Sequence, residues 1–544
     1  MITIFDSTLR DGAQGEGISY SVRDKLRILS ILDEFGIDYI EAGNPASNPK
    51  DAEFFKLAAD VRLKNARLAA FGSTRRRNLR PEEDKSLESL LRSGAPTAVV
   101  FGKSHKLHAE KVLGVSGEEN LELISSSISF LKPRSEEVFF DAEHFFDGYE
   151  YDPEYALLTV GAAFSAGADS VTLCDTNGGT LPDRVGEIVR AVRERFPALK
   201  IGIHTHDDSG LAVACSLSAV KAGASLVQGT LTGIGERCGN CDLSVLIPDL
   251  TLKCGEQCGK RPVKLETLME TSRKISDISN IATRPSKPYT GRSAFSHKGG
   301  MHIDAMEKLP GSYEHIDPSL VGNKRRLLLS EVAGRSTVIE KVKSFLPELD
   351  RSSPETELLV KRLKEMEHDG WQFEAADASF ELMTRRLLKS LGSSFRVVFY
   401  KVTDDFPSTD GKLQSGAMIQ VEVDRRSETT ASLGNGPVNA LDIALKKALK
   451  VFYPVLGNVT LTDFKVRVIE ANSTTAAMVR VLIESTDSER VWTTVGVSHD
   501  IIEASFIALC DALEYKLLIE NEKGAPHRAE KEASASGKGD NANE

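Results

Sequence analysis

The chain has 544 residues, of which 41% are hydrophobic and 27% charged, and its formal net charge is -11. This length exceeds one ordinary domain, and the composition is typical of a globular protein with enough apolar material for large cores. The acidic balance excludes a broad nucleic-acid-binding surface, which needs clustered Lys and Arg. No apolar run approaches the roughly 20 residues of a membrane-spanning helix.

The N-terminus predicts a cytoplasmic protein, because residues 2–5 read as a strand and chemistry-bearing residues follow directly, without an export segment. The seven cysteines are odd in number and unevenly spread, which argues against a disulfide framework. Cys238, Cys241, Cys254 and Cys258 cluster in the sequence, but only twelve residues separate the two pairs. Zinc ribbons usually separate theirs by about 15–20 residues, so isolated thiols are favoured over a structural zinc site.

Residues 1–254 alternate short β-branched runs with longer amphipathic stretches. The predicted strands cover residues 2–5, 37–42, 68–71, 98–101, 138–141, 170–174, 201–204 and 226–228. Helical periodicity occurs between them at residues 22–35, 121–131, 153–166, 185–196 and 211–222. Eight strands alternating with helices over about 250 residues favour an α/β fold of the (β/α)8 TIM-barrel type over an open doubly wound sheet.

Three further regions are expected after the barrel. Residues 255–390 contain Pro and Gly interruptions and charged helical segments at 338–345 and 355–366, which indicates a connector of small helical subdomains. Residues 391–520 contain alternating runs, such as 418–423 and 465–469, that predict antiparallel strands with one exposed face. Residues 521–544 lack large apolar side chains and predict a disordered tail.

Two alanine-rich helices indicate a duplication within residues 391–520. Alanines recur at i, i+4 and i+8 in residues 440–448 and again, 64 residues later, in residues 504–512. Because this offset is longer than a solenoid repeat, it favours a duplicated strand–strand–strand–helix unit that forms one pseudo-symmetric α+β domain. Coincidence between two amphipathic helices is the alternative.

His204 and His206 follow the seventh predicted strand, two positions apart. Side chains at this spacing on an extended segment point to the same face and could hold one divalent metal ion. Asp11 follows the first strand and Asn240 the eighth, and strands seven, eight and one are neighbours in a closed barrel. We therefore expect the four side chains to converge at the C-terminal mouth, where barrel enzymes keep their active sites. Their mixed nitrogen and oxygen ligands suit a catalytic Mn²⁺, Mg²⁺ or Zn²⁺.

Four other polar residues follow predicted strands. Arg10, beside Asp11, could place a positive charge next to a reacting oxygen, or it could form an ordinary salt bridge at the rim. Glu143 is a candidate acid or base, and Thr176 could hydrogen-bond a substrate carboxylate, although both could simply cap loops. Glu41 could orient Arg10 or have a purely structural role.

Three motifs in this order resemble the isopropylmalate, homocitrate and citramalate synthase family. They are Asp-Ser-Thr-Leu-Arg-Asp-Gly-Ala-Gln at residues 6–14, the His204 and His206 pair, and the glycine-rich residues 233–240. The resemblance extends over residues 1–518, and residues 10–19 and 47–51 are most similar to the long-form citramalate synthase branch. At residues 42–45, however, the chain has Ala-Gly-Asn-Pro where that branch has Gly-Gly-Trp-Pro.

The resemblance implies an acyltransferase that condenses acetyl-CoA with a 2-oxo acid. With pyruvate the product is citramalate, on the route to isoleucine; the alternative is 2-oxoisovalerate, giving isopropylmalate on the route to leucine. The duplicated C-terminal domain then implies an amino-acid effector. A segment at residues 296–304 resembles the family's stretch that reaches into a partner's active site, which implies a homodimer.

The resemblance also implies roles for individual residues. The implied metal site comprises Asp11, His204, His206 and Asn240, with Asn240 at or near the metal. The implied catalytic residues are Arg10, Glu143, His302 and Tyr313. Arg10 and Thr176 are the implied contacts of the 2-oxo acid.

Two other functional classes fit parts of this pattern. A lyase of the same superfamily would run similar carbon–carbon chemistry in reverse, but it has no need of a duplicated C-terminal domain. A non-enzymatic amino-acid sensor would use that domain, but it has no need of Arg10, Asp11 and the two histidines together.

Overall fold

The computed structural model describes residues 1–297, 300–309, 311–327, 335–350, 352–388, 391–405, 414–469, 477–487 and 489–522. They form two compact units. The barrel unit comprises Met1–Ser296 and Glu314–Arg326, and the C-terminal unit comprises His297–Tyr313 and Leu327–Glu544. Nearly all of the expected disordered tail, residues 523–544, lies outside the described residues. Within the described part of the chain, no helix is long and apolar enough to span a membrane.

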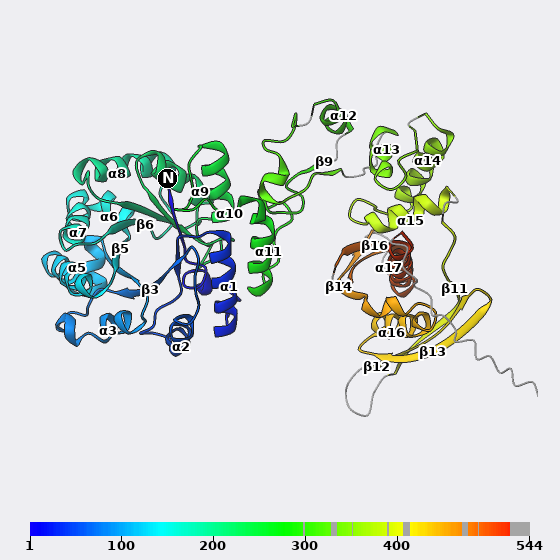
Figure 1. Cartoon of the computed structure of the whole chain (residues 1–544), viewed down its shortest axis with the longest axis horizontal. Coiled ribbons are helices and arrows are strands. Elements are labelled where there is room, and N and C mark those ends of the chain that lie inside the picture. The colour runs from blue at the N-terminus through cyan, green and yellow to red at the C-terminus, as the bar shows by residue number, and fades with distance from the viewer. Residues whose placement is uncertain are drawn as a thin grey trace, which may run out of the picture. The chain divides into compact units, whose positions relative to one another are not determined.

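The barrel unit contains the predicted closed barrel of eight parallel strands (Figure 1). The strands pair in chain order, and β8 pairs with β1 to close the ring. Their bounds are Thr3–Asp6 (β1), Tyr39–Glu41 (β2), Arg67–Ser73 (β3), Thr97–Lys103 (β4), Glu137–Glu143 (β5), Ser170–Asp175 (β6), Ile201–Thr205 (β7) and Leu226–Gly229 (β8). Each predicted strand overlaps one of these eight, so the predicted fold is confirmed.

Helices surround the ring of strands. They are α1 (Val22–Phe35), α2 (Pro49–Ala58), α3 (Lys85–Arg92), α4 (Lys106–His108), α5 (Gly117–Leu131), α6 (Phe145–Tyr151), α7 (Pro153–Ser165), α8 (Pro182–Arg195), α9 (Ala212–Lys221) and α10 (Leu243–Pro248). The residues that start and end these helices are close to the helix ends in the sequence. In α1, Ser21 and Asp24 form a capping box at the start, and Gly36 ends the helix with a φ of 108°.

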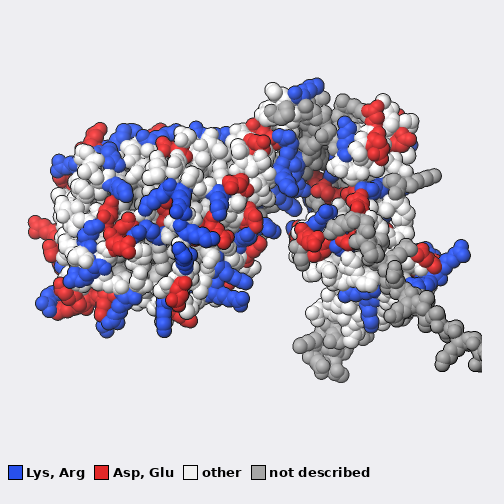
Figure 2. All heavy atoms as spheres, in the orientation of Figure 1, with Lys and Arg blue, Asp and Glu red and all other residues white. Residues whose placement is uncertain are grey.

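The barrel interior is packed with side chains and is not a channel. Phe5, Tyr39 and Phe139 form an aromatic cluster inside it, with ring centroids 5.1–6.3 Å apart. This filling leaves the polar groups at the carboxyl ends of the strands to line an open mouth. On the face shown in Figure 2, the charges of the barrel unit are of mixed sign and do not gather into a basic stripe.

Between the barrel and the duplicated domain the chain forms short helices and two-residue strands. The elements are α11 (Leu268–Ile278), β9 (Ser296–His297), α12 (Gly300–Lys308), β10 (Arg326–Leu327), α13 (Arg335–Lys343), α14 (Pro354–His368) and α15 (Asp377–Leu387). The helical segments predicted at 338–345 and 355–366 correspond to α13 and α14. The helix α11, which the periodicity did not predict, packs on α1 of the barrel unit.

The C-terminal unit contains the predicted duplication. Its elements are β11 (Arg396–Asp405), β12 (Gln414–Val423), β13 (Arg426–Gly434), α16 (Pro437–Lys450), β14 (Thr460–Val468), β15 (Val479–Thr486), β16 (Val491–Ser498) and α17 (Ile501–Glu522). Each half is a three-stranded antiparallel sheet followed by a helix, and Figure 1 shows α16 lying against β12 and β13.

The two halves repeat one hydrogen bond between sheet and helix. Thr430 Oγ1 donates to the carbonyl of Ala444 at 2.8 Å, and Thr494 Oγ1 donates to the carbonyl of Ala508 at 2.8 Å. Both pairs are related by the same offset of 64 residues that the alanines show. The repeated alanines are buried, and their small side chains allow the helix backbone to lie close enough to accept these hydrogen bonds from the sheet. The duplication is therefore structural, and coincidence is excluded.

Candidate active site

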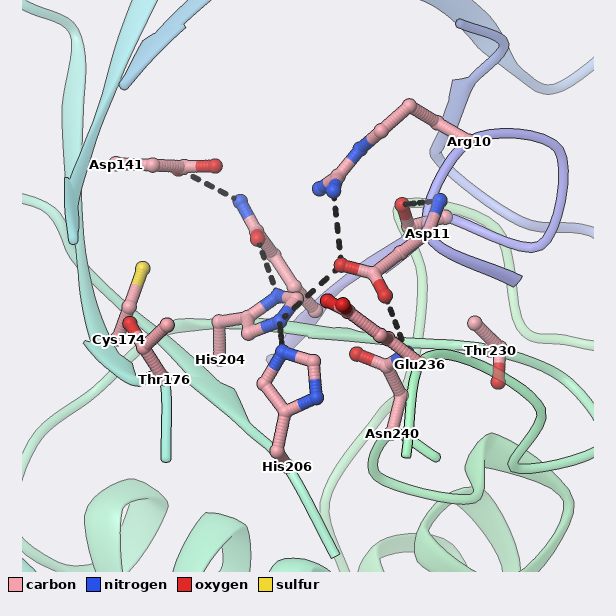
Figure 3. Close-up of polar contacts among 12 residues, drawn as sticks. Arg10, Asp11, Asp141, Cys174, Thr176, His204, His206, Thr230, Glu236 and Asn240 are labelled. Carbon is pink, nitrogen blue, oxygen red and sulfur yellow. Dashed lines mark hydrogen bonds and ion pairs between the residues drawn. The ribbon is translucent and has the colours of Figure 1, made fainter. Parts of the chain in front are cut away.

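Asp11, His204 and His206 place one ligand atom each within 4.8 Å of one another at the barrel mouth. The Nε2 atoms of the two histidines are 3.3 Å apart, and His204 Nε2 lies 3.8 Å from Asp11 Oδ2 (Figure 3). Asn240 Nδ2 donates to Asp11 Oδ1 at 2.8 Å. All four side chains are buried. The structure thus brings together the four residues that the sequence predicted to converge.

This group fits a divalent cation on two observations. Gln228 Oε1, which can only accept, lies 2.9 Å from His204 Nδ1, so that nitrogen carries the proton and Nε2 presents a lone pair to Asp11 and His206. Asn240 Oδ1 and His206 Nδ1 are buried with no hydrogen-bond partner among the described residues. Buried polar atoms are rarely left unpaired, so the donor set is consistent with an ion bound among these side chains.

The protonation states also suit metal binding. Burial and the neighbouring His206 lower the pKa of His204 to about 3, and burial lowers the pKa of His206 as well. For Asp11, burial alone would raise the pKa, but Arg10, the two histidines and the Asn240 hydrogen bond outweigh it and hold the pKa well below its usual range. At neutral pH the site therefore offers two neutral imidazoles and one carboxylate, the forms that bind a cation.

Arg10 is fixed beside this group by carboxylates on both sides. Its Nη1 donates to Asp11 Oδ2 at 2.8 Å and its Nε donates to Glu41 Oε2 at 2.6 Å. Ser7 Oγ donates to the same Glu41 oxygen, and the guanidinium carbon lies 4.0 Å from the centre of the Phe71 ring. The structure thus shows the suggested contact between Glu41 and Arg10. The Arg10 side chain is only 14% exposed, so its charge is held in one place at the mouth.

Glu143 and Thr176 also line the pocket, which has a volume of about 220 Å³. Glu143 forms an ion pair with Lys103 at 2.5 Å. Thr176 Oγ1 accepts a hydrogen bond from the backbone N–H of His144 at 2.8 Å, which leaves its own hydroxyl proton available to a ligand.

Several pocket residues were not predicted from the sequence. Phe71 and Phe101, at the ends of β3 and β4, stack with ring centroids 5.0 Å apart and form an apolar wall. Asp141, in β5, is fully buried and accepts from Gln228 Nε2 at 3.0 Å; burial and the nearby Glu41 raise its pKa to about 7. The sequence feature that could have identified these residues is their position near the carboxyl ends of neighbouring strands, where ligands of barrel enzymes bind.

The glycine-rich loop at residues 233–240 carries Arg237 to the pocket. Arg237 pairs with Asp208 at 2.8 Å and donates to the carbonyl of Thr176 at 2.7 Å. Gly239 has a φ of 99°, and a Cβ there would lie 2.0 Å from the carbonyl oxygen of Gly233, so only glycine fits. This loop closure explains the motif, and Cys238 and Cys241 are free thiols within or beside it.

His302 and Tyr313 belong to the C-terminal unit. They are exposed and stack on each other, with ring centroids 4.1 Å apart and an interplanar angle of 19°. The structure brings these two predicted residues together, but it describes the barrel pocket without them. Their catalytic role stays a prediction.

Comparison with known protein families identifies the class of protein to which this chain belongs. Residues 1–275 match the HMGL-like family, residues 289–370 the homocitrate synthase post-HMGL domain-like family, and residues 374–517 the LeuA allosteric (dimerisation) domain. The fold is thus that of an HMGL-like barrel in a chain that also carries a LeuA-type domain.

Sequence identity to full-length relatives shows which family within this class the chain belongs to. The chain is 49% identical to the (R)-citramalate synthase of Aquifex aeolicus, over 96% of this chain and 99% of that protein, and 48% identical to that of Geobacter sulfurreducens, over 95% and 98%. It is 28% identical to the 2-isopropylmalate synthase of Pelotomaculum thermopropionicum, over 96% and 99%. The chain belongs to the (R)-citramalate synthase family.

Proposed function

We propose that this chain condenses acetyl-CoA with pyruvate and hydrolyses the thioester product, giving (R)-citramalate and free CoA for isoleucine biosynthesis in the cytoplasm. The observation that carries the proposal is one pocket lined both by Arg10 and the group of Asp11, His204 and His206 and by the rings of Phe71 and Phe101. A small 2-oxo acid needs both, because its carboxylate and carbonyl are polar and its methyl group is apolar.

Asp11, His204 and His206 would hold the divalent cation, with Asn240 beside them. When bound, the ion polarises the carbonyl of the 2-oxo acid as a Lewis acid. Mn²⁺, Mg²⁺ and Zn²⁺ are the candidates, and the two imidazoles favour a transition metal over Mg²⁺.

The protein's own groups would orient the acceptor and stabilise charge. Arg10 provides a fixed positive charge next to the oxygen that becomes negative as the new carbon–carbon bond forms. The Thr176 hydroxyl proton is available to the acceptor's carboxylate. Because Arg10 is already held by Glu41 and Asp11, little reorganisation is needed during the reaction.

A base must remove one proton from the acetyl methyl group before the carbon–carbon bond forms. Glu143 and His302 are the two candidates. The resulting enolate attacks the carbonyl carbon of pyruvate, and one water molecule then cleaves the thioester. We expect Glu143→Gln and His302→Asn to lower kcat unequally, with the larger loss and the lost limb of the pH profile identifying the base.

The reaction is tested by measuring the release of free CoA from acetyl-CoA in parallel with three acceptors: pyruvate, 2-oxoisovalerate and 2-oxoglutarate. We expect pyruvate to be strongly preferred and chelation to abolish activity. Preference for 2-oxoisovalerate would instead indicate 2-isopropylmalate synthesis and point to the Ala42–Pro45 segment, which differs from the family branch. Release with none of the three acids would overturn the proposal.

We further propose a homodimer in which His302 and Tyr313 complete the partner's site. Mixing Asp11→Ala with His302→Ala subunits tests this, because a mixed dimer then contains one intact site. We expect about one quarter of wild-type activity after random exchange. No recovery despite subunit exchange would place His302 in its own subunit's site, and full activity of His302→Ala by itself would place His302 outside the reaction.

For the LeuA-type domain we propose feedback inhibition by isoleucine. Both tryptophans of the chain, Trp371 and Trp492, lie in the C-terminal unit, so tryptophan fluorescence reports on that unit alone. We expect isoleucine to inhibit CoA release and to change this fluorescence, with leucine as the matched control. Inhibition without a fluorescence change would argue for competition at the barrel.

A further inference from the structure

A second group of metal-ligating side chains lies on the loops beside the pocket. His105 follows β4, His108 ends α4, and Asp147 belongs to α6. Each offers one ligand atom, these atoms lie within 4.8 Å of one another, and all three side chains are half-buried. We propose that His105, His108 and Asp147 form a second divalent-cation site that takes Zn²⁺, Co²⁺ or Ni²⁺.

The carboxylate of Asp147 provides an independent indication of a ligand. Its Oδ1 is buried and has no hydrogen-bond partner among the described residues. Leaving a buried acceptor unsatisfied is unfavourable, and a bound cation would satisfy it. Its Oδ2 accepts from His144 Nδ1 at 2.9 Å and from Asn177 Nδ2 at 3.2 Å. These two donors orient the carboxylate in the way that outer-shell partners orient metal ligands.

The rings of His105 and His108 lie next to each other. They stack with centroids 4.4 Å apart and an interplanar angle of 6°, so one ring must turn about its side-chain torsions for both to coordinate the same ion. His105 Nδ1 accepts from the backbone N–H of Leu107 at 3.2 Å. Coordination through either ring nitrogen of His105 replaces only this long hydrogen bond.

The backbone holds the two loops at close range. The N–H of Ser104 donates to the carbonyl of Glu143 at 2.9 Å, which ties the end of β4 to the end of β5. A Cβ on Gly148 would lie 2.7 Å from the Ser104 carbonyl oxygen and 2.9 Å from His105 Cα. Glycine beside Asp147 therefore permits α6 to approach the His105 segment, so the three ligands are brought together by packed backbone.

The donor set selects the kind of ion. Two imidazole nitrogens and one carboxylate oxygen suit Zn²⁺, Co²⁺ and Ni²⁺, whereas Mg²⁺ and Ca²⁺ prefer oxygen ligands. Three protein ligands leave at least one position open to water. The site shares no residue with the group of Asp11, His204 and His206, and it does not depend on the proposed reaction.

Equilibrium dialysis of the metal-free full chain against Zn²⁺, in excess Mg²⁺, tests the proposal. We expect two tightly bound equivalents in the wild type, one in His108→Asn and one in His204→Asn. The matched control is His315→Asn, which removes an exposed histidine outside both groups and should leave two equivalents. Circular dichroism establishes that each variant is folded.

Asp147→Asn provides a second variant and should also leave one equivalent. A wild type that binds a single equivalent, with none left in His204→Asn, would overturn the second site and leave the proposed function intact. Two equivalents retained in both folded His108→Asn and Asp147→Asn would overturn it as well, because the second ion would then bind elsewhere.

Discussion

Charged side chains buried at the barrel mouth face a pocket, whereas those buried along α17 face protein partners. Asp11 and Arg10 lie beside polar atoms that have no hydrogen-bond partner in the described part of the chain, namely Asn240 Oδ1 and Glu41 Oε1. On α17, Asp511 accepts from Ser379 and Arg386, and Lys516 donates to Asp487 and Glu520. Burial of charge is therefore not by itself a sign of function; unsatisfied groups that converge on a pocket are.

The largest effect that this comparison predicts is at Arg10. We expect Arg10→Gln, which can still hydrogen-bond Glu41, to lower kcat by about 10²–10³-fold through loss of the fixed positive charge. Arg10→Lys keeps the charge but not the planar fork, and its loss should be smaller. Steady-state CoA release measures both. Equal losses in the two variants would show that geometry, and not charge, is what Arg10 contributes.

Unlike Arg10, Lys516 should contribute to stability and not to catalysis. Lys516→Met removes the buried cation that donates to both Asp487 and Glu520, and we expect a loss of about 3 kcal/mol in the free energy of unfolding. Urea unfolding followed by tryptophan fluorescence measures it, with kcat unchanged. Lys465→Met, which removes an exposed ion pair with Asp463, is the matched control and should cost little. A lowered kcat in Lys516→Met would contradict the expectation that charges buried along α17 affect only stability.

Gln228 supports the barrel site without lining the pocket. Gln228→Leu removes the acceptor that fixes the His204 tautomer, and we expect a 10–100-fold weaker affinity for Co²⁺ at the site that His204→Asn abolishes. Gln228→Glu keeps the acceptor for His204 but loses the donor to Asp141, so its affinity should fall less than that of Gln228→Leu. Unchanged affinity in Gln228→Leu would mean that the two histidines are oriented by packing alone.

The smallest expected effect is the pH dependence due to Asp141. Its folded pKa of about 7 lies above its unfolded value, so the unfolded chain ionises first and stability is lost as pH rises from about 4 to 7. Asp141→Asn should remove this loss, raising the free energy of unfolding at pH 8 and leaving it nearly unchanged at pH 4. Urea unfolding followed by circular dichroism at the two pH values measures it. If Asp141→Asn stabilised the protein equally at pH 4 and pH 8, the raised pKa of Asp141 would be contradicted.

Much of this molecule was determined by local sequence pattern. The alternation of β-branched and amphipathic segments predicted all eight barrel strands, and the 64-residue offset between the alanine-rich helices predicted the duplication. The spacing of His204 and His206, with Asp11 and Asn240 after neighbouring strands, predicted their convergence, because parallel strands in a closed ring bring their carboxyl ends to one edge.

Other features were decided only by the tertiary structure. The Gln228 hydrogen bond to His204, the burial that raises the pKa of Asp141, and the approach of Asp147 to His105 and His108 join residues on different strands or loops. No period in the sequence encodes such contacts, because they depend on strand register and on close backbone packing such as that at Gly148. The sequence therefore determined which elements form and which faces they bury, whereas packing between elements decided which polar groups meet.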